Sequence, residues 1–253
     1  MSEIFAYPTI KEVAFEIKFP NLFSIENKIG EFQEKIISRF PDSKLVLQRH
    51  LLFGTKGMPA NKDSDEELNP AAVTKIWTFL SKEEIEVRVK TNSVNIISKK
   101  HKTYNNPNEQ QRFKDTIEFV IGNFLSTINV PLVNRIGLRY IDECPLPTSD
   151  NETLSRLYNS SFPSSRFSMK DVSESYLFIN CVRKNHRLIY QESKVKTLEG
   201  KDAIILDFDG FETNVAAKDY LQITDELYQI IHDEYFDIIK DPVKQYMRTG
   251  KHE

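Results

Sequence analysis

The chain has 253 residues, 40% of them hydrophobic and 28% charged, which is the composition of a globular protein with a substantial apolar core. The length fits one large domain or two small fused domains. The formal net charge is −3, so the chain lacks the overall positive charge that draws proteins to nucleic acid, and binding to a polyanion would need a local basic patch.

Strand and helix patterns alternate through the first 130 residues. Val13, Phe15 and Ile17 alternate with less apolar residues, which is the period of a half-buried strand. The patterns predict, in chain order, strand 13–19, helix 24–40 with Ser24 as its N-cap, strands 45–53, 72–80, 85–90 and 94–98, and helix 108–128. The polar stretch 54–70 has no apolar periodicity and is predicted to be a mobile loop.

The order of patterns then starts again. It predicts strand 133–141, a short helix 152–158, strands 166–169, 175–183, 187–193 and 203–208, a long helix 215–239 with Asn214 as its N-cap, and a polar C-terminal tail. Residues 184–186 are expected to turn the chain between two of these strands.

This order predicts an α+β protein made of two tandem β-α-β4-α units, residues 1–130 and 131–253. Runs of strands followed by a long helix indicate antiparallel sheets with the long helices packed on one sheet face. We expect a pseudo-twofold arrangement of the two units, as one continuous curved sheet or as two packed sheets. The order resembles the repeat of the TATA-binding-protein-like fold, a saddle whose concave sheet can hold a ligand, although fold alone does not fix function.

Residues 204–210 resemble the first motif of haloacid-dehalogenase-type phosphotransferases, in which an Asp at a strand end attacks phosphate beside magnesium. In that family the strand opens a Rossmann-like domain, whereas here too little chain follows it, and no threonine follows Gly210. We therefore interpret the segment as an alternating strand with Asp207 and Asp209 facing outward. A metal site at the two aspartates is the alternative.

No other catalytic motif is evident. The five histidines, His50, His101, His186, His232 and His252, show no metal-ligand spacing with one another or with cysteine. The chain has no Gly-x-Ser-x-Gly sequence, phosphate-binding glycine loop or dinucleotide fingerprint, and it has only eight glycines. We therefore expect no catalytic residues, no metal and no cofactor in a protein that is not an enzyme.

Basic residues recur on the predicted strands and in their connections. If they share the open face of the sheet, they can contact phosphates or an acidic partner. The alternative is that they are ordinary solvated charges balanced by 37 acidic residues. The candidate partner-binding or anion-binding residues are Arg88, Lys90, Lys99, Lys100, Lys102, Arg135, Arg139, Arg183, Lys184 and Arg187.

Arg135 and Arg139 flank Gly137 on one face of the strand 133–141. A glycine inside a strand permits a close backbone approach or a bulge. The two arginines form either an anion-binding face or internal ion pairs with acids on neighbouring strands, such as Glu86 or Asp207. The ion-pair interpretation is preferred.

Cys144 and Cys181 lie far apart in the sequence and in apolar or strand-like contexts, so we expect reduced core thiols in a reducing compartment. No apolar run is long enough to cross a bilayer, and no basic start precedes an apolar segment. These features predict a soluble cytoplasmic protein without membrane insertion.

Four short segments together resemble a known family. They are residues 7–13, 77–79, 135–141 and 206–209, and the Arg-Ile-Gly-Leu-Arg-Tyr stretch of the third is the most specific. They look like an uncharacterised family of prokaryotic proteins of about this length, described only as sporadically distributed. The resemblance implies a bacterial or archaeal cytoplasmic protein, and a patchy distribution implies mobile genes, often of the defence type. It implies no reaction and no functional residues.

Three functions are consistent with these features. The first is a non-enzymatic accessory subunit of a prokaryotic defence or regulatory complex. It would use a sheet face or edge to contact a protein partner and, directly or through that partner, a nucleic acid; a second copy of the chain is a further candidate partner. The second is a small-molecule sensor with an apolar pocket between the sheet and the helices. The third is a metal-dependent hydrolase at Asp207 and Asp209.

Overall fold

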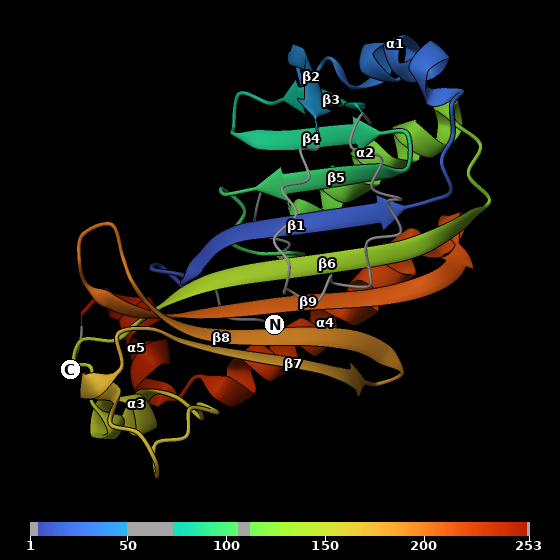
Figure 1. Cartoon of the computed structure of the whole chain (residues 1–253). Coiled ribbons are helices and arrows are strands. Elements are labelled where there is room, and N and C mark those ends of the chain that lie inside the picture. Colours follow the sequence, from blue (N-terminus) through green and yellow to red (C-terminus); the bar gives the residue numbers. More distant parts are fainter. Residues whose placement is uncertain (1–4, 50–72, 106–111, 252–253) are drawn as a thin grey trace.

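A computed structural model describes residues 5–49, 73–105 and 112–251 of the chain. The strands in these ranges form one antiparallel sheet of nine strands, in the order β2-β3-β4-β5-β1-β6-β9-β8-β7 (Figure 1). The strands are β1 (Ile10–Lys18), β2 (Asp42–Arg49), β3 (Val73–Leu80), β4 (Ile85–Lys90), β5 (Ser93–Ser98), β6 (Leu132–Pro145), β7 (Ser175–Arg183), β8 (His186–Lys196) and β9 (Asp202–Ala216). The helices are α1 (Ile25–Ile36), α2 (Phe113–Thr127), α3 (Asn151–Leu157), α4 (Tyr220–Ile238) and α5 (Asp241–Thr249).

The two faces of the sheet differ in what covers them. On β1, the predicted alternation places Val13, Phe15 and Ile17 in the core, and all three are fully buried. The long helices α2 and α4 lie across this face, which we call the helix face (Figure 1). The opposite face, which we call the open face, carries none of the helices in the described ranges.

The first strands of the two predicted units pair with each other at the centre of the sheet. Phe15 of β1 lies opposite Leu138 of β6 in an antiparallel ladder, and β6 pairs along its length with β9. Of the two arrangements expected, a single continuous sheet is therefore the one observed. The α+β class and the packing of helices on an antiparallel sheet are confirmed.

The strand predicted at 166–169 is absent, and this prediction was wrong. A single 3-10 turn, Met169–Asp171, follows an irregular stretch there. Side chains hold its backbone: Asn151 accepts from the Met169 amide at 2.7 Å, and Lys194 donates to the carbonyls of Met169 and Val172 at 3.0 and 2.6 Å. Three strands, rather than four, therefore follow the first helix of the second half, so this part of the predicted repeat is not observed.

The second half differs from the sequence prediction at two further points. Asn214 does not cap a helix; it lies inside β9 with a φ of +56°, because β9 follows β6 as far as Ala216 and α4 begins only at Tyr220. The polar tail forms α5, because Val243 and Met247 share one face of it and are buried.

Several local predictions are confirmed. Lys184 and Asn185 have φ values of +48° and +73°, which is the backbone of a two-residue hairpin turn between β7 and β8. Ser24 precedes α1 as predicted, although its side chain makes no capping hydrogen bond. The predicted loop at 54–70 lies outside the described residues. Within the described ranges, none of the helices combines the length and hydropathy that a membrane span requires.

Candidate functional site

Arg135, at the centre of the open face, is neutralised by two acids from its neighbouring strands. It donates to Glu16 on β1 and, at 2.6 and 2.7 Å, to both carboxylate oxygens of Asp209 on β9. Gly137 provides the space for this arrangement, because a Cβ built there would lie 2.4 Å from Nη1 of Arg135. The glycine inside β6 therefore lets the guanidinium fold back over the strand.

Arg139 makes the ion pair that the preferred interpretation predicts. Its Nε donates to Asp207 Oδ1 at 2.8 Å and its Nη2 to Oδ2 of the same carboxylate. Glu86, the other acid named, pairs instead with Arg88 on its own strand at 2.7 Å. The central arginines of the open face are thus occupied by protein carboxylates, which leaves them less charge for an outside anion.

The same ion pairs remove support from the hydrolase alternative. Asp207 and Asp209 lie on the open side of β9 as predicted, but Asp207 is only 7% exposed, and both carboxylates already hold a guanidinium. In the described part of the chain, no group of three His, Cys, Asp or Glu side chains is placed to hold a metal ion.

The remaining candidate basic residues do not converge. Lys99 and Lys100 follow β5, Arg183 and Lys184 lie at the β7–β8 turn, and Arg187 lies on the open face of β8. Three of the set are paired with acids: Lys100 with Glu83, Arg183 with Glu234, and Lys184 with Asp233. Lys90, Lys99 and Arg187 make no ion pair within the described ranges. The predicted anion-binding set is therefore spread over separate parts of the molecule and does not form one site.

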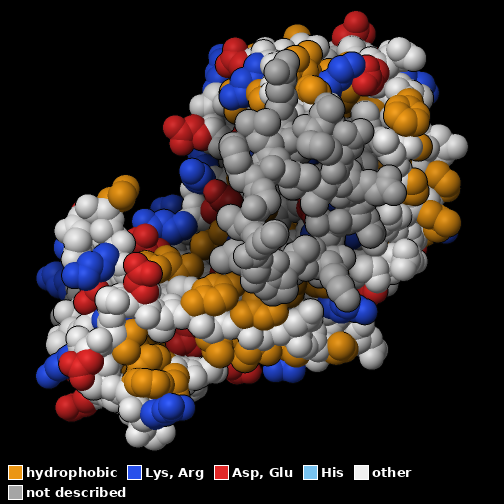
Figure 2. Space-filling view, in the orientation of Figure 1, with side chains coloured by type: hydrophobic (Ala, Val, Ile, Leu, Met, Phe, Trp, Pro, Cys, Tyr) orange, Lys and Arg blue, Asp and Glu red, His pale blue; other side chains and the backbone are white. Residues whose placement is uncertain are grey.

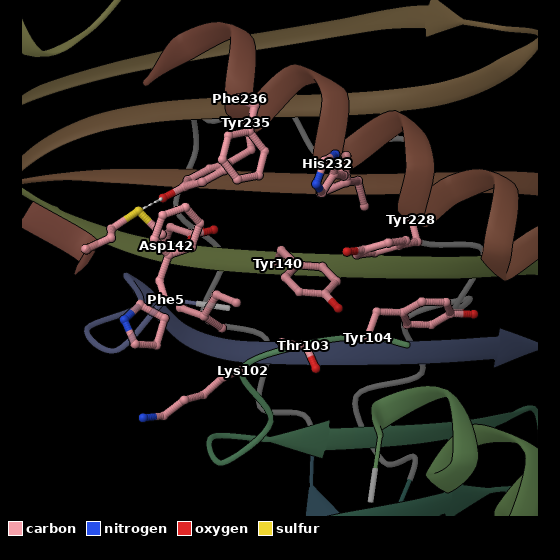
Figure 3. Close-up of a pocket in the computed structure, with 14 residues that line it drawn as sticks. Phe5, Lys102, Thr103, Tyr104, Tyr140, Asp142, Tyr228, His232, Tyr235 and Phe236 are labelled. Carbon is pink, nitrogen blue, oxygen red and sulfur yellow. Dashed lines mark hydrogen bonds between the residues drawn. The ribbon is translucent and has the colours of Figure 1, made fainter. Parts of the chain in front are cut away.

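A pocket lies on the helix face, between β6, α4 and the segment that follows β5 (Figure 3). Its cavity of about 90 Å³ has room for a few waters or a compact organic group. Aromatic rings supply half of the lining residues: Phe5, Tyr104, Tyr140, Tyr228, Tyr235 and Phe236, together with the imidazole of His232. Pro8, Ile10, Ile231 and Met247 complete the apolar part, and Lys102, Thr103 and Asp142 are its other polar members.

Helix geometry explains why α4 contributes so many of these rings. Tyr228, His232 and Phe236 are four residues apart and lie on one face of α4. Their ring centroids follow one another at 5.7 and 4.6 Å, and Tyr104 stacks on Tyr228 at 4.6 Å. The result is a continuous aromatic wall along one side of the pocket (Figure 3).

A carboxyl group lies among these rings. Asp142 of β6 is 3% exposed and accepts a hydrogen bond from Thr9 Oγ1 at 2.7 Å, and that hydroxyl is 2.6 Å from Tyr235 Oη. No Lys, Arg or His of the described ranges forms an ion pair with it. Burial, and to a smaller extent the charge of Asp207, raises the pKa of Asp142 from 3.8 to about 7, although the Thr9 hydrogen bond lowers it.

The N-terminal segment and α5 hold each other beside the cavity. The amide of Tyr7 donates to the carbonyl of Met247 at 2.8 Å, and the Met247 sulfur lies 3.4 Å from Tyr235 Oη. Phe5 packs against Phe236 with ring centroids 6.1 Å apart. The two ends of the chain thus both contribute to the pocket lining.

Among the lining residues, Lys102 alone belongs to the set of site residues predicted from the sequence, as a basic residue. Lys102 is exposed, and its side chain extends away from the stacked Tyr104 and Tyr228 (Figure 3). Two signals for the rest were present. Asp142 continues the inward alternation of β6, which puts a carboxyl where an apolar residue is expected, and α4 carries aromatic residues at a spacing of four.

A scan against protein-family models, a search of curated proteins and a search of solved structures each found no match to this chain. The resemblance to the sporadically distributed prokaryotic family therefore stays a prediction, and so does the defence role that it implies.

Proposed function

We propose that this chain binds a small organic molecule in the pocket between β6 and α4. The observation that carries the proposal is the buried carboxyl of Asp142, which faces an aromatic cavity without a charged partner among the described residues. Burying a carboxyl in this way costs free energy that an apolar side chain would not cost. Pockets with apolar walls and few polar groups are typical of small-molecule sites, and perturbed carboxyls concentrate there.

The hydrogen-bonding state of the lining also supports a ligand. Nδ1 of His232 is buried and makes no hydrogen bond within the described ranges, and its distance of 3.6 Å from Asp233 Oδ1 is too long for one. Buried polar atoms are normally hydrogen-bonded, so a nitrogen with only this long contact to Asp233, on a residue that lines the pocket, adds support for a ligand.

The neighbouring groups favour binding over catalysis. Cys144 is a free, fully buried thiol, and burial raises its pKa well above the ordinary value. Burial likewise raises the pKa of Tyr235. Both groups are therefore protonated near neutral pH, and a protonated, buried thiol is a poor nucleophile.

A thermal-shift screen of small molecules tests the proposal. A compound present at about 100 times its dissociation constant stabilises the protein by about 2.7 kcal/mol, which for a chain of this size raises Tm by roughly 5 to 10 °C. Thr103→Trp would fill the cavity from its rim. Thr213→Trp, on the open face of β9, places the same side chain away from the pocket and is the matched control.

We expect compounds that stabilise the wild type and Thr213→Trp but not Thr103→Trp. If no compound stabilises the wild type, or if hits stabilise Thr103→Trp equally, the pocket is not a ligand site.

A second candidate function, a protein interface on β7, has its own observation. β7 ends the sheet and pairs only with β8 among the described strands. Its open-face side chains Tyr176, Phe178 and Val182 are 65%, 52% and 64% exposed, and Figure 2 shows hydrophobic side chains along this lower part of the face. An exposed edge strand with apolar side chains favours pairing with another strand.

A second copy of the chain is the partner that this strand fits by symmetry. Two identical strands can pair antiparallel about a twofold axis, so that each contributes the same apolar residues. Sedimentation velocity at increasing protein concentration should then show a dimer that the double substitution Phe178→Lys and Val182→Lys converts to a monomer. This interface is contradicted if the wild-type protein stays monomeric at about 100 µM, which is on the order of the dissociation constant of a weak dimer.

A further inference from the structure

Building on the proposed function, we propose that the group inserted into the pocket is an organic ammonium ion, with Asp142 as its counter-ion and the aromatic rings as its walls. The charge of the lining, its aromatic rings and the size of the cavity all suit such a ligand.

The charge of the lining selects a cation. Asp142 is the acid in the pocket wall, and no basic side chain of the described ranges pairs with it. A bound anion would place a second negative charge beside the ionised form of Asp142, and a neutral ligand would not compensate that charge. An ammonium ion supplies the missing positive charge directly, which is the condition under which a buried carboxylate becomes favourable.

The rings suit the same ligand. Cations bind over aromatic faces, and sites for alkylated ammonium ions are built from several such rings. Tyr104 offers its ring rather than its hydroxyl, because the hydroxyl donates to Asp225 at 2.9 Å and points away from the cavity (Figure 3). The ring centroid of Tyr140 lies 6.2 Å from that of Tyr228, which also stacks on Tyr104, so three tyrosine rings meet at this wall. The hydroxyl of Tyr235 is likewise engaged, by Thr9.

The size of the cavity limits the group that enters. About 90 Å³ accommodates a compact head group such as trimethylammonium, and the rest of a longer ligand would extend toward solvent. Lys102 is the cation of the lining that opposes such a ligand. It is exposed, and Figure 3 shows it directed away from the tyrosine wall, so water screens its charge.

Choline and its neutral isostere 3,3-dimethylbutan-1-ol test the inference, because they share a shape and differ in charge. Isothermal titration of the full chain should give choline a dissociation constant at least about tenfold lower than that of the alcohol. In Asp142→Asn the two dissociation constants should become similar. The matched control is Asp237→Asn, which removes an exposed carboxylate on the same helix as the aromatic wall and should keep the discrimination.

Tyr228→Leu provides a second variant in case Asp142→Asn does not fold, and it should weaken choline more than the alcohol. Equal affinity for the two compounds would overturn the ammonium assignment. The ammonium assignment would also be overturned if choline failed to bind while neutral compounds bound to the wild type and not to Thr103→Trp. That result would leave the proposed function intact. If no compound of either class binds, both the ligand class and the proposed function fall.

Discussion

At the level of single residues, Gly137 and Arg135 depend on each other. The guanidinium occupies the space that a side chain at 137 would need, and there it reaches Glu16 and Asp209 and lies over the ring of Phe211, 4.7 Å from its centroid. The pairing of a glycine with a nearby arginine on the same face of a strand is therefore explained by local packing, without an outside ligand.

Gly137→Ala is expected to destabilise the protein by about 1 to 3 kcal/mol, because the new methyl group displaces the Arg135 guanidinium from two carboxylates. In an Arg135→Met background the same substitution should cost less than half as much. Gly30→Ala, on the exposed side of α1 with nothing within 4 Å, should instead stabilise by about 0.5 to 1 kcal/mol. Urea unfolding of the variants measures all three values, and an unchanged cost in the Arg135→Met background would refute the explanation.

Asp142 should make stability depend on pH in a direction opposite to that of most carboxyls. Its pKa is raised from 3.8 to about 7, chiefly by burial, so the folded protein retains a proton that the unfolded chain has released. The free energy of unfolding should therefore fall as pH rises from about 4 to 7, by at most about 4 kcal/mol, and stay level above that range.

In Asp142→Asn the side chain at position 142 is uncharged at every pH, so the unfolding free energy of this variant should lack the pH-dependent contribution of Asp142. Urea titrations of both proteins between pH 4 and 8 give the difference, which isolates Asp142 from His232 and Lys102, the other titratable members of the lining outside the tyrosines. If the difference in unfolding free energy between the two proteins stays constant from pH 4 to 8, the carboxyl of Asp142 is already ionised at pH 4 in the folded state.

At the level of elements, two polar side chains on the helix face of β8 fix the irregular segment before β7. Glu192 accepts from Ser160 and from the amide of Ser161, and Lys194 donates to two carbonyls around the 3-10 turn. These contacts join residues that are 22 to 32 positions apart in the sequence. Local sequence patterns do not reveal contacts over this separation, so the pattern at residues 166–169 predicts a strand that the structure does not contain.

Lys194→Met is expected to cost about 1 to 3 kcal/mol, because the buried carbonyl of Met169 and the half-buried carbonyl of Val172 lose their donor. Hydrogen exchange should accelerate most in the segment around the 3-10 turn. Lys196→Met, at the exposed end of the same strand, is the control and should leave both stability and exchange nearly unchanged. Equal effects of the two substitutions would show that the segment is held by other contacts.

The elements that were predicted well are those whose pattern is local. Alternation on β1 and β4 and the apolar stripe of α2 follow from two-residue and 3.6-residue periods. The pocket is different, because Asp142 and Tyr228 meet only once β6 and α4 are packed together. The sequence shows that Asp142 is unusual on β6 and that Tyr228 is part of an aromatic series on α4, but only the fold brings the two residues to one pocket.

At the scale of the whole molecule, the two halves of the chain share one sheet and one core. β1 lies between β5 of its own half and β6 of the other, so separating the halves would uncover the buried residues of both central strands. We therefore expect residues 1–253 to unfold in a single transition, and expect that neither 1–130 nor 131–253 folds cooperatively alone.

Trp77, the one tryptophan of the chain, reports on β3 in the first half, whereas far-ultraviolet circular dichroism reports on the whole chain. The two signals should follow the same denaturant curve. A separate fluorescence transition, or a cooperative melt of either fragment, would mean that the halves are independent domains.

The pocket itself is tested most directly by the histidine ring signals in an NMR titration with a stabilising compound. The chain has five histidines, of which His232 lines the pocket, while His186 lies at the β7–β8 turn and contacts Glu212 and Glu226 at 2.9 Å. We expect saturable shifts of the His232 ring with no change at His186. Binding that leaves the His232 signals in place would show that the ligand occupies another site.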